Sequence, residues 1–241
     1  MNIVIIPTRI DSSRIPGKAG FEICGNTLLE YVIAAGRRAK TINHVVLATT
    51  DSPDDVNFIM DYYEVAYVHI SNIEDRNDVL GRFVETVEEI EKVFDCEVEN
   101  IVRLTHDCPL LAFHSSLIDE IMMHHVSNKC DFSHNKGNYC SGLDVEIMTK
   151  KAMIAINNIA NKEEREHVTL AFKNIPDKYN IGTFNSYYGN PSNDKILFED
   201  KWSIDTMEEF KKVSDIIKMY VMKEGDLNGN RYKYSHEFQI R

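Results

Sequence analysis

Short apolar runs rich in β-branched residues alternate along the chain with longer segments whose apolar residues recur at helical spacing. The runs lie at residues 3–6, 45–48, 65–70 and 101–104. Alternation of this kind is typical of a parallel sheet covered by helices on both faces. The pattern therefore predicts an α/β fold with three layers and a mostly parallel sheet.

The segments between these runs begin with residues that commonly cap helix N-termini. The three predicted starts are Thr27 to Glu30, which has capping-box spacing, Asp51 or Ser52 before Pro53, and Asn77–Asp78. Strand, loop and helix thus follow one another in regular order, which predicts one continuous domain.

The periodicity loosens over residues 130–190, where polar and aromatic loops surround two candidate strands at 144–148 and 179–184. We expect this segment to form a small inserted or appended lobe. Residues 1–225 as a whole are predicted to be a single domain.

Regularity returns near the end of the predicted domain. A short strand is expected at 202–205, followed by a capping box from Thr206 to Glu209 that opens a last helix. Residues 226–241 have the composition of a polar C-terminal tail.

Composition narrows the classes of function. The chain has 241 residues, 43% of them hydrophobic, and a formal net charge of -11. An acidic chain lacks the basic face that binds nucleic acid, and no apolar stretch approaches the length of about 20 residues that spans a bilayer. We therefore expect a cytoplasmic protein without a nucleic-acid or membrane partner.

The five cysteines form no C-x-x-C pair and are odd in number. This pattern suggests neither a zinc site nor a disulfide framework, so reduced structural thiols are expected.

The stretch PTRIDSSRIPGK, residues 7–18, stands out in this acidic chain because it concentrates the cations Arg9, Arg14 and Lys18 directly after the first apolar run. Ligands of open α/β sheets bind beyond the carboxyl ends of the strands. Guanidinium and ammonium groups at that place suit a polyphosphate, although a solvated basic turn explains the same residues.

Two carboxylates are predicted at the same sheet edge. Asp107 follows the run at 101–104, and Asp205 lies at a later strand-to-helix junction. Magnesium bound to substrate phosphates commonly takes one or two protein carboxylates, so this pair suits Mg²⁺. A helix N-cap is the alternative role for Asp205 or for Thr206.

Seven motifs occur in one order: RIDSSRIPGK, ATTDSPDD, NDVLGRF, RLTHDCPL, GLDVE, REHVT and WSIDT. In this order they resemble the cytidylyltransferases that make CMP-activated acidic sugars. The branch of spore-coat polysaccharide biosynthesis is most similar, and CMP-sialic acid and CMP-Kdo synthetases are also similar. The resemblance covers residues 2 to about 220 and implies a Rossmann-like nucleotide-diphospho-sugar transferase fold and a homodimer.

The resemblance implies roles for individual residues. Those implied to bind CTP are Pro7, Arg9, Ser12, Arg14, Lys18, Thr49, Thr50, Arg82 and Asp107, with Arg9, Arg14, Lys18 and Asp107 acting in catalysis. Asp107 and Asp205 are implied to bind Mg²⁺. The sequence departs from the family pattern at His106, beside the metal carboxylate, and at Asp11 inside the cationic loop.

The looser middle segment, residues 130–190, is implied by the resemblance to bind the acceptor and to carry the dimer contact. The expected residues are His106, His134, Tyr139, Asp144, Glu146, Arg165 and His167. Asp144 and Glu146 alternate as strand residues that point to one face, whereas Arg165 and Glu166 could form a structural pair on a helix.

The resemblance implies that CMP is transferred from CTP to an anionic acceptor and that pyrophosphate is released, in the synthesis of a surface-polysaccharide precursor. The acceptor classes are an acidic sugar, a sugar or polyol phosphate, and a phosphonate. The alternatives are a sugar-1-phosphate uridylyl- or thymidylyltransferase, a glycosyltransferase of similar architecture, and a non-catalytic nucleotide-binding subunit.

Overall fold

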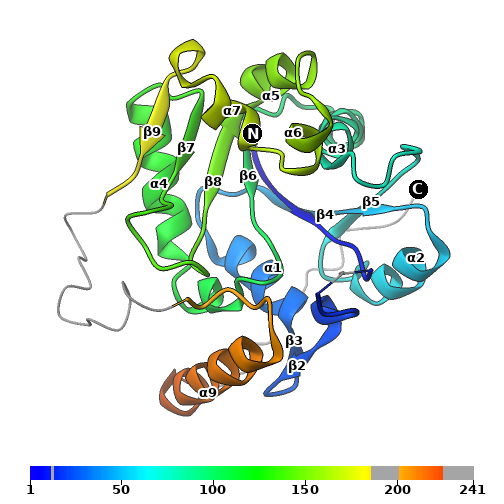
Figure 1. Cartoon of the computed structure of the whole chain (residues 1–241), viewed down its shortest axis with the longest axis vertical. Coiled ribbons are helices and arrows are strands. Elements are labelled where there is room, and N and C mark those ends of the chain that lie inside the picture. The colour runs from blue at the N-terminus through cyan, green and yellow to red at the C-terminus, as the bar shows by residue number, and fades with distance from the viewer. Residues whose placement is uncertain (12–13, 186–200, 225–241) are drawn as a thin grey trace.

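The structure is a computed structural model, and it describes residues 1–11, 14–185 and 201–224. Its centre is a sheet whose seven strands in this part of the chain follow the order β5-β4-β1-β6-β8-β7-β9 (Figure 1). The strands are β1 (Asn2–Pro7), β4 (His44–Thr50), β5 (Tyr67–Ser71), β6 (Asn100–Arg103), β7 (Phe132–His134), β8 (Glu146–Thr149) and β9 (Ile181–Thr183). All pairings are parallel except those of β8, which runs antiparallel to β6 and to β7.

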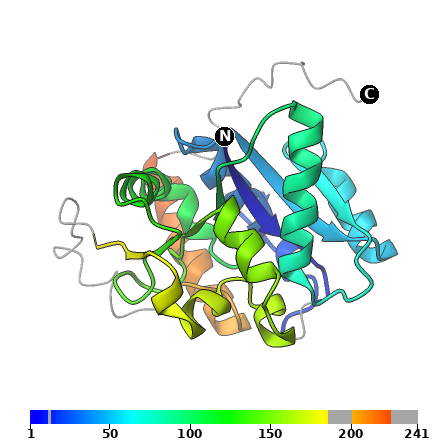
Figure 2. The same cartoon turned by 90° about the horizontal axis from the view of Figure 1, so that it is seen from above.

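Helices cover both faces of this sheet, as Figure 2 shows from above. The helices are α1 (Leu28–Arg38), α2 (Pro53–Ile59), α3 (Val79–Phe94), α4 (Ser116–Ser127), α5 (Lys150–Asn157), α6 (Lys162–Glu166), α7 (Leu170–Asn174) and α9 (Met207–Glu224). Short 3-10 turns are η1 (Lys18–Gly20), η2 (Met60–Tyr62), η3 (Pro109–Phe113) and η4 (Pro176–Lys178), and β2 (Glu22–Ile23) pairs with β3 (Asn26–Thr27).

Alternation along β1 creates two hydrophobic cores. Val4 and Ile6 pack on one face of the sheet with α1, α4 and α9. Ile3 and Ile5 pack on the other face with α3, α5 and α7. All four side chains are fully buried. Because successive strand residues point to opposite faces, one apolar run supplies both cores, which confirms the three-layer α/β prediction.

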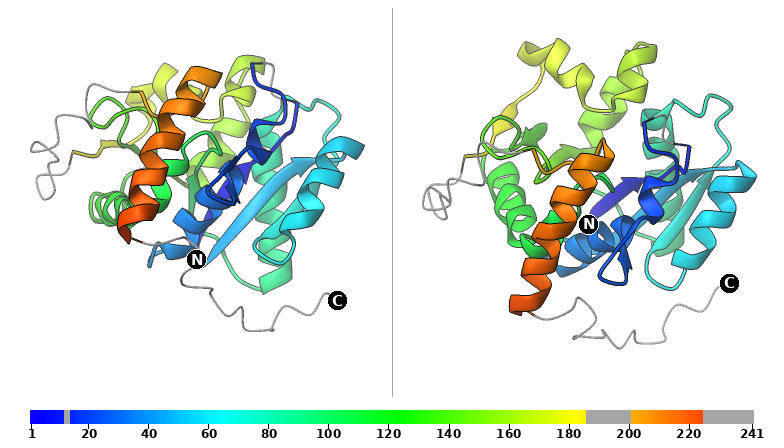
Figure 3. Two further views of the ribbon diagram at one scale, coloured as in Figure 1. Left: turned by 90° about the horizontal axis from the view of Figure 1, so that it is seen from below. Right: turned by 60° about the horizontal axis from the view of Figure 1, so that its bottom comes forward.

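Helix α9 closes one side of the molecule and lies beside the β2–β3 hairpin (Figure 3). Phe210 meets Phe21 edge-on at a ring distance of 5.3 Å. Tyr220 stacks on Phe113 at 4.8 Å. These contacts, one near each end of α9, fix the helix and with it the preceding segment that carries Asp205.

The predicted helix starts are confirmed: Thr27 forms the capping box of α1, Ser52 caps α2, and Asp78 caps α3. The strand expected at 65–70 begins later, at Tyr67, because the amides of Val65 and Ala66 bond back to the Tyr62 carbonyl in a turn.

One expectation for the second half needs correction. Residues 202–205 form no strand; the Trp202 and Ser203 amides donate to one carbonyl, that of Ser141, instead of entering a ladder. The sequence pattern also did not reveal β7. The segment 130–190, as far as it is described, contributes β7, β8 and β9 to the main sheet and thus extends it.

Within the residues that the structure describes, no helix has the length and apolar character needed to cross a bilayer.

Candidate active site

A polar cleft of about 210 Å³ opens at the carboxyl ends of β1 and β6. Four segments line it: Arg14 from the first loop, residues 103–108 after β6, residues 136–146 before β8, and residues 203–205 before α9. Because β8 runs antiparallel to β6, its first residue reaches the same edge as the last residue of β6. The cleft therefore lies at the edge of the sheet where ligands of open α/β sheets bind.

The ammonium group of Lys18 lies between Asp107 and Asp205, the two carboxylates predicted to bind a metal ion. It is 3.7 Å from Asp107 Oδ2 and 3.6 Å from Asp205 Oδ1, and it donates a hydrogen bond of 2.6 Å to the Ile204 carbonyl. Only 5% of Lys18 is exposed. The two carboxylates thus converge on one buried cation, although they come from distant parts of the chain.

Glycines allow the close approach of these segments. Gly17, with φ 71°, precedes η1 and turns the chain so that Lys18 points inward. At Gly142, with φ 110°, an added Cβ would lie 2.3 Å from the Trp202 carbonyl carbon. Since real side chains do not tolerate such a contact, only glycine lets residues 202–205 pack here. The Ile204 amide then donates to the Asp107 carbonyl at 3.0 Å.

Ion pairs and nearby charges surround both Asp107 and Asp205. Burial by itself raises the pKa of Asp107, but the neighbouring charges of His106 and Lys18 outweigh it and lower the pKa below its usual value. Asp205 pairs with Arg14 at 3.0 Å and with Lys201 at 2.8 Å. A positively charged ligand bound to Asp107 and Asp205 would contact the carboxylate oxygens that these lysine and arginine side chains now contact.

The pair has the donor chemistry of a magnesium site. No group of three or more metal-ligating side chains exists within the described residues, so protein ligands here are limited to these two carboxylates. Asp205 Oδ1 is buried and, apart from its ion pairs with Arg14 and Lys18, has no hydrogen-bond partner in that part of the chain. Mg²⁺ shared with substrate phosphates needs no more than one or two carboxylates, and the residues therefore fit it.

At the other end of the cleft, Glu146 is buried between two cations. Its Oε2 accepts a bond of 2.7 Å from Arg103, and its Oε1 lies 3.0 Å from Lys136 and accepts from Thr169 at 2.9 Å. Burial raises the pKa of Glu146, but Arg103 and Lys136 reverse this and lower the pKa to about 2. Glu146 thus stays ionised with both oxygens in use.

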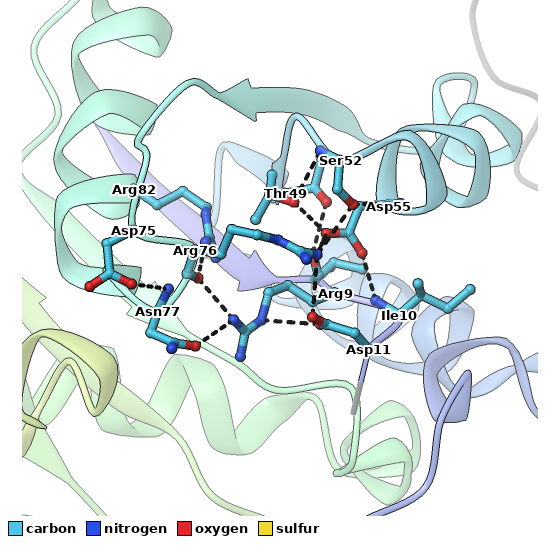
Figure 4. Close-up of polar contacts among 12 residues, drawn as sticks. Arg9, Ile10, Asp11, Thr49, Ser52, Asp55, Asp75, Arg76, Asn77 and Arg82 are labelled. Carbon is cyan, nitrogen blue, oxygen red and sulfur yellow. Dashed lines mark hydrogen bonds and ion pairs between the residues drawn. The ribbon is translucent and has the colours of Figure 1, made fainter. Parts of the chain in front are cut away.

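Arg9 belongs to a different cluster from Arg14 and Lys18 (Figure 4). Its Nη1 donates to the Arg76 carbonyl at 2.9 Å and to Asn77 Oδ1 at 2.8 Å. The atypical Asp11 lies 3.7 Å from its Nε. The cationic loop therefore divides its charges between the cleft and the segment that precedes α3.

Asp55 ties this second cluster together. Its carboxylate accepts from the Ile10 amide at 2.8 Å, pairs with Arg76 Nη2 at 3.1 Å, and accepts from the Thr50 hydroxyl. Burial opposes ionisation, but these bonds lower its pKa overall. The loops after β1, β4 and β5 are thus fixed on one buried carboxylate (Figure 4).

Arg82, on α3, is 1% exposed and points toward the same cluster (Figure 4). Its Nη2 donates to the Arg76 carbonyl at 2.7 Å, while its Nε and Nη1 are buried without a hydrogen-bond partner in the described chain. Burial and the nearby Arg9 lower its pKa to about 10. A buried arginine with free donors provides charge for an anion or a base carbonyl.

The remaining residues assigned to CTP lie near this cluster. Pro7 ends β1 in register with Ala48 of β4, and the Thr49 hydroxyl donates to the Thr8 carbonyl at 2.9 Å. Thr50 contacts Asp55, as described above. Ser12 lies outside the described residues.

Several residues assigned to the acceptor are not among those that line the cleft. The His106 ring donates to the Pro7 carbonyl, the His134 ring bonds to the backbone of Lys136, and Tyr139 packs against the hydrophobic core. Arg165 pairs with Asp78 at 2.7 Å, which joins α6 to α3. His167 is exposed at the end of α6.

Asp144 and Glu146 both line the cleft, so the two side chains face the same way, as their alternation predicted. Burial raises the pKa of Asp144. The cleft residues that sequence reasoning did not assign include Arg103 and Lys136. Arg103 stands inside the RLTHDCPL motif, and a charged residue at the end of an apolar run was a usable signal. Nothing in the sequence around Lys136 distinguishes it.

A three-layer α/β fold with cations and paired carboxylates at the carboxyl edge of the sheet is the architecture of a nucleotidyltransferase. The chain belongs to the cytidylyltransferase family, whose sequence profile matches residues 3–235. The family resemblance inferred from the seven motifs is thereby confirmed.

Individual proteins agree with this assignment. The chain is 28% identical to the spore coat polysaccharide biosynthesis protein SpsF of Bacillus subtilis over 185 residues. This aligned region covers 74% of this chain and 72% of SpsF. A cytidylyltransferase structure from Leptospira borgpetersenii superposes with a TM-score of 0.78, at 22% identity, over 95% of this chain and 91% of that one. A CMP-Kdo synthetase structure with CTP has a TM-score of 0.66, at 15% identity, over 91% and 99%. The two structures establish the fold.

Proposed function

We propose that this protein transfers CMP from CTP to an anionic small molecule and releases pyrophosphate, in the synthesis of a surface-polysaccharide precursor. The acceptor is an acidic sugar, a sugar or polyol phosphate, or a phosphonate. The observation that carries the proposal is the convergence of Asp107 and Asp205 on Lys18 in the cleft. The family membership adds CTP as the nucleotide.

In this proposal, Arg14 and Lys18 bind the triphosphate at the cleft, and Arg9 and Arg82 bind the nucleotide from the adjoining cluster. An anionic acceptor oxygen attacks the α-phosphorus, and the bond to the pyrophosphate oxygen breaks. Cations placed before the reaction stabilise the charge on the leaving group, so positioning and electrostatics account for the catalysis.

Mg²⁺ would be held by Asp107 and Asp205, and it would supply charge neutralisation for the phosphates. The ammonium of Lys18 would then turn from the carboxylates to the triphosphate. An acceptor that attacks through a carboxylate, phosphate or phosphonate oxygen needs no general base, because that oxygen carries no proton. A sugar hydroxyl would need a base to take its proton, and Asp107, Asp144 and His106 are the candidates.

A homodimer also belongs to the proposal, and light scattering coupled to size-exclusion chromatography tests it independently of activity.

The test of the reaction is pyrophosphate release from CTP, UTP, GTP, ATP and dTTP with magnesium, against a panel of acidic sugars, sugar phosphates and phosphonates. Release with CTP and one acceptor supports the proposal and identifies the acceptor. Release with UTP or dTTP alone assigns the chain to sugar-1-phosphate transfer instead. CTP binding without any release contradicts the catalytic proposal for this panel.

A further inference from the structure

Two cations at the acceptor end of the cleft have no role in the reaction described so far. Arg103 is the last residue of β6, and Lys136 follows closely after β7. Both line the cleft, with 22% and 36% of their side chains exposed. They are therefore anchored in the protein yet reach the space where a substrate would lie.

Glu146 holds both cations but cannot itself bind the acceptor. It is 1% exposed, and each of its oxygens already has a partner: Arg103 at Oε2, and Lys136 with Thr169 at Oε1. Since a carboxylate shared by two cations neutralises only one of them, a net positive charge is left at this end of the cleft. Arg103 Nε is buried and has no hydrogen-bond partner in the described part of the chain.

The other carboxylates of the cleft do not cancel this charge. Asp107 and Asp205 are paired with Lys18 at the opposite end. Asp144 lies nearer, but it forms no ion pair within the described residues, and its burial favours the neutral form. Its oxygens and the hydroxyl of Ser141 suit the hydroxyl groups of a ligand whose anionic group lies against the cations.

We propose that Arg103 and Lys136 bind the anionic group of the acceptor, a carboxylate, phosphate or phosphonate, and that Glu146 is a positioning residue for both. The planar guanidinium of Arg103 offers paired donors that match such an anion, and the ammonium of Lys136 adds a point charge. The inference rests on the proposed function, because it places the acceptor beside a CTP bound at the Lys18 end.

Anion binding can be measured without turnover. The probes are methylphosphonate and pyruvate, observed by ligand NMR at millimolar concentrations, where fragments of this size bind. We expect both to bind the wild-type protein, and we expect Lys136→Met to weaken the binding about tenfold or more, as loss of a charge-assisted contact does. Lys151→Met, at an exposed position on α5, is the matched control and should bind as the wild type does.

Two results would overturn the inference. One is that neither probe binds the wild-type protein. The other is that Lys18→Met abolishes binding while Lys136→Met does not, which would place the anion at the triphosphate end. A third result separates the two proposals. If Lys136→Met loses probe binding but the wild-type protein releases no pyrophosphate with any nucleotide and acceptor, the proposed reaction is refuted and the anion site stands.

Kinetics with the acceptor that the panel identifies separate positioning from folding. Lys136→Met should raise KM for the acceptor about tenfold and leave KM for CTP nearly unchanged. Glu146→Gln should raise KM for the acceptor in the same direction, whereas Glu146→Asp, which keeps the charge, should recover part of it. Equal effects of Glu146→Gln on both substrates would show a structural role alone and contradict the positioning role.

Discussion

Lys18 and Asp205 lie far apart in the sequence, yet the Lys18 ammonium is 3.6 Å from Asp205 Oδ1 and is almost completely buried. The same ammonium donates to the Ile204 carbonyl, so backbone and side chain of one segment are both held by one cation. This contact joins the first loop of the chain to the segment just before its last helix, at the cleft that Asp205 lines.

Asp107→Asn should abolish magnesium-dependent pyrophosphate release and leave the fold intact, because the amide keeps the size of the side chain but lacks its charge. The measurement is turnover with CTP and the acceptor, alongside circular dichroism. Asp215→Asn, at an exposed carboxylate on α9, is the control. Substantial turnover by Asp107→Asn would refute the metal role.

Lys18→Ala should weaken CTP binding by about 1.5 to 3 kcal/mol, the range for a hydrogen bond to a charged group. Calorimetric titration of CTP measures this directly. The exposed Lys151 provides the comparison variant, Lys151→Ala. Unchanged CTP affinity in Lys18→Ala would contradict the assignment of the first loop to the triphosphate.

Glu146→Gln should destabilise the protein by about 3 kcal/mol at pH 7, since a pKa lowered to about 2 from 4.5 corresponds to roughly that free energy. The folded-state pKa is the lower one. The contribution is therefore complete above the unfolded pKa, near pH 4.5, and is lost as the pH falls toward 2. Urea unfolding at pH 7 and at lower pH tests this.

The wild-type and Glu146→Gln stabilities should converge over that acidic range. Glu88→Gln, at an exposed position on α3, should show no comparable difference at any pH. A constant gap between the wild type and Glu146→Gln from pH 7 downward would mean that ionisation of Glu146 does not cause the effect.

Gly142→Ala should displace residues 202–205, because its Cβ would lie 2.3 Å from the Trp202 carbonyl carbon and its φ of 110° is strained for alanine. We expect a lower unfolding midpoint and a loss of activity that exceeds the loss of CTP affinity, since Asp205 would move. Gly137→Ala also has a positive φ but open space around its Cβ, so it isolates the steric part. Equal losses in both variants would exclude the contact as the cause.

The sequence by itself determined the fold class and the edge of the sheet at which the candidate site lies. Apolar runs such as 3–6 and 101–104 must be buried, and capping residues such as Thr27 bond the free amides at a helix start. The positions of these strands and helices therefore follow from neighbouring residues in the sequence. Arg14, Lys18 and Asp107 followed, because the ends of neighbouring parallel strands meet at one edge of the sheet.

Only the tertiary structure decided which polar residues share the cleft. Arg9 and Lys18 stand in one loop but bind in different clusters, whereas Arg103, Lys136 and Glu146 meet because β8 runs antiparallel to β6. The apolar pattern states which residues are buried, but not which buried charges are partners. Such pairs form between residues far apart in the chain, where burial makes an unpaired charge costly and folding brings its partner near.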